Sequence, residues 1–217
     1  MDIFHWFIDF VLHIDQHLIQ LLADYGTAVI FIIALIIFCE TGLVVTPILP
    51  GDSMIFAFGA IAAQSTTHLS VHLSAAVFVA AAFLGNLVNY SIGRFIGPKV
   101  YEKNYKLIKR EYLDRTRKFF EKHGAMTIIY TRFAPILRTF APFIAGVGQM
   151  PYGKFMLYNF IGGFSWVLAF IYSGYFFGNI PFVKEHFESI VLGIILVSLV
   201  PALYAALRSR FTVKKTT

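Results

Sequence analysis

Long apolar stretches alternate with short polar segments along most of this chain. Four of these stretches cover residues 27–45, 73–96, 155–177 and 190–207. Each approaches the roughly 20 residues that an α-helix needs to cross the hydrocarbon core of a bilayer. The pattern predicts an all-α integral membrane protein with about four transmembrane helices.

Two further apolar segments contain proline and are too short to cross a bilayer. They lie at about 46–68 and about 124–149, and we expect both to enter the membrane, break and turn back, since proline ends or kinks a helix. The residues expected to break the first segment are Pro47, Pro50 and Gly51, and those expected to break the second are Pro135 and Pro142. We therefore predict two re-entrant hairpins.

The distribution of Lys and Arg gives these segments a direction. Basic residues gather in the segment 98–123 and again towards the C-terminal tail, 211–217. The positive-inside rule places both on the cytoplasmic side, which predicts cytoplasmic N- and C-termini and hairpins that open to opposite sides. Opposite hairpins that share the letters Pro-Ile-Leu favour an inverted repeat, as in secondary transporters. The alternative is that two unrelated hairpins have similar compositions.

The first 25 residues predict an amphipathic helix on the membrane surface, because their polar residues recur at helical spacing. His5, Asp9 and His13 share one face of this helix, and that spacing is compatible with metal binding. We favour a solvated or inter-subunit face and expect no metal site. This segment has four aspartates and no Lys or Arg, unlike the start of a cleaved signal peptide, so we expect it to stay on the protein.

Composition agrees with a membrane protein and argues against nucleic-acid binding. Hydrophobic residues make up 58% of the chain and charged residues 14%, and mean hydropathy is +0.70. This is more apolar material than one soluble core can bury. The net charge of +6 comes from basic residues between the apolar stretches, not from one basic face. We expect a single transmembrane domain at 26–210.

The charged residues of interest in the segments predicted to lie at membrane depth are Glu40, Asp52, Arg132 and Arg138. Charge in the membrane is costly, so such side chains face a cavity or a partner. Two arginines near one spot suit a phosphate group, which guanidinium groups grip with paired donors. The carboxylates are then expected to hold the arginines or to exchange protons. The alternative is that the four charges only neutralise each other.

Several uncharged polar residues lie close to these positions in the predicted fold. The candidates for supporting hydrogen bonds are Asn89, Tyr90, Tyr130, Thr139 and Asn159. Each of them fits ordinary packing equally well.

Motifs typical of enzymes are absent from the sequence. It contains no HExxH, no GxSxG and no Walker loop, and its single cysteine, Cys39, allows no intrachain disulfide. We therefore expect neither catalysis nor a cofactor.

Several motifs together resemble one known family. They are Glu40-Thr41-Gly42, Pro50-Gly51-Asp52-Ser53, Tyr90-Ser91-Ile92-Gly93-Arg94, the run 132–146 from Arg132 to Gly146, and Gly174-Tyr175-Phe176-Phe177-Gly178. In these features the chain is similar to the DedA family of bacterial inner-membrane proteins, also called the SNARE-associated or VTT-domain family. The resemblance implies that Glu40, Asp52, Arg132 and Arg138 are functional residues. Asn86 departs from some relatives, which have Asp there, and this puts proton coupling in doubt.

The resemblance also implies a location in a bacterial inner membrane and a function. Members of the family are linked to recycling of undecaprenyl phosphate, to phospholipid translocation and to proton-dependent maintenance of the envelope. We expect a flippase for a lipid-phosphate head group, with a polyprenyl phosphate or phospholipid as partner, protons as the coupling ion and no nucleic acid. The alternatives are a passive scramblase, a proton-dependent exporter of small molecules and an envelope organiser that transports nothing. Faces of small residues are compatible with a homodimer.

Overall fold

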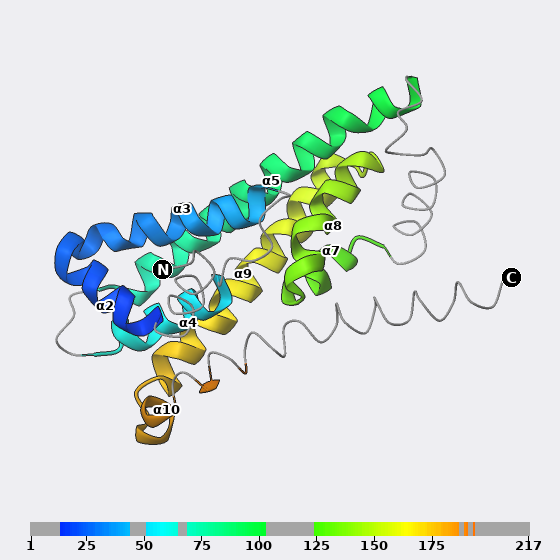
Figure 1. The fold of residues 1–217 in the computed structure, drawn as a ribbon. Coiled ribbons are helices and arrows are strands. Elements are labelled where there is room, and N and C mark those ends of the chain that lie inside the picture. The colour runs from blue at the N-terminus through cyan, green and yellow to red at the C-terminus, as the bar shows by residue number, and fades with distance from the viewer. Residues whose placement is uncertain are drawn as a thin grey trace, which may run out of the picture.

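The computed structural model describes residues 14–43, 51–64, 69–102, 124–186, 189–190 and 193. All regular elements in this part of the chain are helical, which confirms the predicted all-α class for these residues (Figure 1). In chain order the elements are α2 (Ile14–Tyr25), η1 (Gly26–Ala28), α3 (Val29–Gly42), α4 (Gly51–Ala62), α5 (Val71–Glu102), α7 (Thr127–Tyr130), η2 (Thr131–Phe133), α8 (Pro135–Val147), α9 (Tyr152–Phe177) and α10 (Pro181–Glu185).

Two of the predicted spans are long helices. Val71–Gly97 within α5 and Tyr152–Phe177, which is α9, are both long enough and apolar enough to cross a membrane. The first expected span is shorter than predicted, since α3 has 14 residues and reaches back to Gly26 only through η1. The last expected span, 190–207, lies almost wholly outside the described residues. The number of spans therefore stays a prediction.

The long helices α5 and α9 form the centre of the fold and run in opposite directions (Figure 1). Helix α3 packs along α5, α4 packs on α9, and α8 packs on α5. The two short helices α4 and α8 lie towards opposite ends of the long pair in Figure 1. Each half of the chain thus docks its short helix on the long helix of the other half.

Glycines allow these docked helices to approach closely. A Cβ atom at Gly59 in α4 would collide with the backbone of α9, and one at Gly174 in α9 would collide with the backbone of α4. The seam between α5 and α8 is built in the same way, with Gly93 on α5 and Gly146 on α8. Small residues permit such backbone contact between membrane helices. The matching seams agree with the predicted inverted repeat, while re-entry into the membrane stays a prediction.

The proline breaks can be followed only in part. Pro47 and Pro50 lie outside the described residues, and α4 begins at Gly51. In the second segment the break falls before Pro135, where Ala134 is extended and proline occupies the first turn of α8. Pro142 lies inside α8 and does not end it. Because proline has no N–H, it leaves the carbonyl of Arg138 without the α-helical bond from residue 142.

Other predictions fall on residues outside the described part. These are most of the amphipathic segment, including His5, Asp9 and His13, the basic residues 103–123 and the tail. The described piece of the N-terminal segment is helical as α2, and α5 continues to Glu102, beyond the expected end of that span. In the described ranges, no group of three His, Cys, Asp or Glu side chains is placed to bind a metal ion.

Candidate functional site

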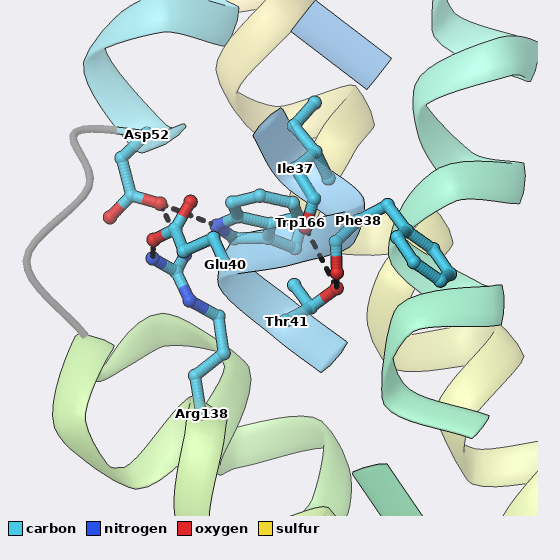
Figure 2. A network of polar contacts seen from close by, with 7 residues as sticks. All are labelled: Ile37, Phe38, Glu40, Thr41, Asp52, Arg138 and Trp166. Carbon is cyan, nitrogen blue, oxygen red and sulfur yellow. Dashed lines mark hydrogen bonds and ion pairs between the residues drawn. The ribbon is translucent and has the colours of Figure 1, made fainter. Parts of the chain in front are cut away.

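Arg138 joins two carboxylates from different helices. Its Nη2 donates to Oε1 of Glu40 on α3, and its Nη1 donates to Oδ1 of Asp52 on α4 at 2.5 Å (Figure 2). All three side chains are buried: Glu40 is 0% exposed, Asp52 7% and Arg138 2%. The structure therefore gathers three of the four predicted charged residues into one centre, which we call the Arg138 triad (Arg138, Glu40 and Asp52).

The local sequence explains why the carboxylates meet there. Asp52 lies in the first turn of α4, where the partial positive charge of the helix N-terminus favours an anion. A Cβ atom at Gly51 would collide with Oε2 of Glu40, so only glycine leaves space for that carboxylate at the start of α4. Arg138 follows Pro135 by three residues and points towards them from the first turn of α8. The end of α3 and the starts of α4 and α8 thus bring the three charges together.

Trp166 on α9 completes this centre. Its indole Nε1 donates to Oδ1 of Asp52 at 3.0 Å, and the Cζ atom of Arg138 lies 4.7 Å from the centre of its ring (Figure 2). A guanidinium at that distance gains cation–π attraction. Trp166 is not among the site residues predicted from the sequence. The signal available was its helical spacing, seven residues after Asn159, on the same face of α9.

The triad has more negative than positive charge. With all three groups ionised, two carboxylates face one guanidinium. In addition, Oε2 of Glu40 and Nε of Arg138 have no hydrogen-bond partner. Removal of a single partner from a buried ion pair is strongly destabilising, because it leaves an uncompensated charge. The triad is thus stable only while a cation holds both acids.

Arg132 lies in a different environment. It comes from η2, is 1% exposed, and its Nη2 donates to the Ala82 carbonyl at 3.2 Å and to Oδ1 of Asn159 at 2.6 Å. Its Nη1 has no partner. A Cβ atom at Gly162 or Gly163 would lie 3.2 Å from the Arg132 side chain, so these glycines of α9 make room for it. Unlike Arg138, Arg132 is held by neutral oxygens.

Asn86 on α5 faces the same guanidinium. In one orientation its Nδ2 donates to Oδ1 of Asn159 at 3.0 Å. With the amide turned over, its oxygen accepts from Nη2 of Arg132 at 2.8 Å and from Nε at 3.3 Å. This second orientation gives both Arg132 donors an acceptor, but it ends the Asn86–Asn159 hydrogen bond, because the Asn86 oxygen then lies 3.0 Å from Oδ1 of Asn159. We call Arg132, Asn86 and Asn159 the Arg132 cluster.

The remaining predicted residues fall in different places. Asn89 donates from Nδ2 to the carbonyls of Thr41 at 3.0 Å and Thr139 at 2.8 Å, so it ties α3 and α8 to α5 next to the triad. Tyr90 donates to the carbonyl of Met150 at 2.5 Å, away from both arginines. Tyr130 is 68% exposed. Of the proposed supporting residues, the structure brings Asn159 to Arg132, Asn89 and Thr139 to the edge of the triad, and neither tyrosine to the charges.

An apolar groove of about 570 Å³ lies between α5 and α9. Its α9 wall is formed by every fourth residue from Phe160 to Tyr172, and its α5 wall runs from His72 to Phe83. Nδ1 of His72 and the Tyr172 hydroxyl lie 2.5 Å apart within this lining. The Phe83 carbonyl accepts from Nδ2 of Asn159 at 3.1 Å, so one residue of the groove lining is hydrogen-bonded to the Arg132 cluster.

Comparison with known proteins identifies relatives of this chain. A VTT domain matches residues 49–176, which include Asp52, both arginines and Trp166. Protein DedA of Escherichia coli (strain K12) is 51% identical over 211 residues, covering 97% of this chain and 96% of that protein. A membrane protein of Mycobacterium leprae (strain TN) is 46% identical over 172 residues, or 79% of this chain and 76% of the relative.

The inner membrane protein YghB of Escherichia coli (strain K12) is more distant, at 30% identity over 187 residues, covering 86% of this chain and 81% of that protein. No solved structure matches the chain. The family match covers more than half of the chain, and the relatives named above match it over most of its length. This chain therefore belongs to the VTT-domain family, the DedA family of membrane proteins.

Proposed function

We propose that this protein moves the phosphate head group of a membrane lipid between the two leaflets, while the hydrocarbon chain stays in the bilayer. Undecaprenyl phosphate, recycled for envelope synthesis, is the substrate we favour. The observation that carries the proposal is the Arg138 triad: a fully buried guanidinium held by two carboxylates from two other helices. Such a charge group is expensive in a membrane protein and indicates a pathway for an ion or a charged group.

The triad has the chemistry of an exchangeable anion site. A phosphate offers oxygens that fit the same guanidinium donors that Glu40 and Asp52 now occupy. The carboxylates hold Arg138 when phosphate is elsewhere and give way when it binds. Because they come from α3 and α4 while Arg138 comes from α8, this exchange would loosen the contact between the two halves of the fold.

Proton coupling follows from the same exchange. A carboxylate released from Arg138 loses its counter-charge, and a proton is the simplest replacement for that charge within a membrane. Phosphate binding at Arg138 would then be accompanied by proton uptake at Glu40 or Asp52.

The groove between α5 and α9 favours a substrate with a hydrocarbon chain. Its lining is almost entirely apolar, and it follows α5 and α9, the helices that carry Asn86 and Asn159. An isoprenoid or acyl chain would lie in this groove while the head group is in the interior. A water-soluble cargo would gain nothing from it.

The test is movement of labelled undecaprenyl phosphate in liposomes that contain the purified protein. A probe added outside would report the lipid exposed in the outer leaflet over time. Wild type should move the lipid, Arg138→Gln should slow movement to the rate of protein-free liposomes, and Arg94→Gln should behave as wild type. Arg94 is an exposed arginine on α5 that bonds only the Tyr90 hydroxyl among the described contacts, which makes it a matched control.

A pH gradient across the same liposomes separates the mechanisms. Faster movement in one direction supports a proton-coupled carrier, and equal movement in both directions indicates a scramblase. No movement of undecaprenyl phosphate by well-folded wild type would refute that substrate. Labelled phospholipids would then be compared in the same liposomes.

A further inference from the structure

We infer that the Arg132 cluster is a second anion site, separate from the Arg138 triad, that receives a phosphate group before the triad does. The inference rests on the proposed function, because it assigns an order of contacts to the same substrate. The first observation is that the two arginines have different hydrogen-bond partners. Both guanidinium groups are almost completely buried, yet Arg138 faces two carboxylates, whereas each partner of Arg132 is a neutral oxygen.

Arg132 has no counter-charge among the described residues. A buried ion is normally paired, since a protein interior solvates a lone charge poorly. No carboxylate lies within ion-pair distance of Arg132 in the part of the chain that the structure describes, and its Nη1 makes no hydrogen bond at all. Among the described residues, Arg132 is therefore the buried cation for which an external anion offers the greatest relief.

The neighbours of Arg132 suit a phosphate oxyanion. A guanidinium binds two oxygens of one group in its plane, which a single-atom anion cannot exploit as well. Asn86 and Asn159 can turn their amides and offer N–H donors to the remaining oxygens. The Gly162–Gly163 pair keeps α9 free of side chains where the guanidinium lies. Because Nη1 of Arg132 is enclosed, an anion reaches this nitrogen only when η2 moves away from Gly162 and Gly163 on α9.

The order of contacts follows from the competition at each arginine. An anion that binds Arg132 displaces neutral hydrogen-bond acceptors only. At Arg138 it must displace two carboxylates, each in a charge-assisted hydrogen bond. The Arg132 cluster is consequently the first contact, and transfer to Arg138 is the step that opens the triad.

Asn86 determines whether this site is open. Aspartate has nearly the same shape as asparagine, but at position 86 it would place a carboxylate within reach of Nη2 and Nε of Arg132. Asn86→Asp would supply the missing counter-charge from inside the protein. The variant should be at least as stable as wild type and should bind phosphate much more weakly. If Asn86 had a purely structural role, Asn86→Asp would instead lower the stability of the protein and leave the phosphate affinity of the folded fraction unchanged.

The experiment measures phosphate binding to the purified full-length protein in detergent by calorimetry, together with its melting temperature. The probes are inorganic phosphate and a short-chain phosphatidic acid. Wild type should bind at least one of them, and Asn86→Asp should weaken that binding at least tenfold with an equal or higher melting temperature. Residue 159 faces the same guanidinium, so Asn159→Asp is a second variant that supplies a carboxylate to Arg132 and should weaken phosphate binding. Gln149→Glu makes the same chemical change on an exposed residue and should bind as wild type.

The two probes distinguish the sources of phosphate. Binding of both shows a site for the phosphate group itself, and binding of only the phosphatidic acid shows a site for a lipid phosphate; both outcomes support the inference. Binding of neither probe, or equal binding by wild type and Asn86→Asp, overturns it. Liposome assays keep the two claims apart. If binding depends on Asn86 but no lipid moves, the proposed function fails and the site stands, whereas normal lipid movement by Asn86→Asp refutes the inference alone.

Discussion

Substitution of Arg138 by Gln tests whether the triad is held together as the structure indicates. The change removes two charge-assisted hydrogen bonds, each worth about 1.5–3 kcal/mol, and the contact with Trp166. It also leaves Glu40 and Asp52 buried together without a cation. Loss of one partner from a buried ion pair typically costs about 3–5 kcal/mol. For a chain of this size that corresponds to a fall in melting temperature of about 6–20 °C.

The melting temperature of each purified variant can be followed by tryptophan fluorescence, since Trp166 lies within the centre. Arg94→Gln is the matched control and should change the free energy of unfolding by less than about 1 kcal/mol, as is usual for an exposed side chain. Adding Glu40→Gln to Arg138→Gln should recover part of the loss, because one of the two unpaired carboxylates is then neutral. The reasoning is wrong if Arg138→Gln melts with the control, or if the double variant is less stable than the single one.

The remaining predictions use the same melting assay. Gly51→Ala should destabilise the protein by about 1–3 kcal/mol, since the new methyl group collides with the Glu40 carboxylate. Gly153→Ala should instead add about 0.5–1 kcal/mol, because its Cβ meets nothing within 4 Å and alanine favours the helix; a loss of stability would contradict this reasoning. Trp166→Phe should cost about 1–3 kcal/mol, since Asp52 loses its indole donor; a neutral effect would argue against that hydrogen bond.

Tertiary contacts separate two arginines that look equivalent in the sequence. Arg132 and Arg138 flank the same proline-rich break, and both are buried. Arg138 meets two carboxylates that are 86 and 98 positions away along the chain, whereas Arg132 meets an asparagine amide 27 positions away and a backbone carbonyl 50 positions away. The two arginines predicted to bind one phosphate therefore differ in their partners: Arg138 is held by carboxylates, and Arg132 has no counter-charge among the described residues.

Much of the fold could be predicted from local patterns. The apolar runs located α5 and α9 because a membrane span needs length and low polarity, and both are local properties of the sequence. Proline located the start of α8, since its ring fits the first turn of a helix and its missing N–H costs nothing there. Proline also misled the prediction at Pro142, which lies within α8, because nothing local shows that neighbouring helices will support an imperfect turn.

The sequence by itself determined which residues are too costly to leave without a role: Glu40, Asp52 and the two arginines, charges in segments of membrane character. Only the tertiary structure decided their partners. It placed Trp166 against the triad and Asn86 against Arg132, and it left Tyr90 and Tyr130 away from the charges. Helical spacing fixes which side chains share a face of one helix, but which faces meet depends on how closely the backbones can approach. In this protein, glycines on helices distant in sequence set that approach.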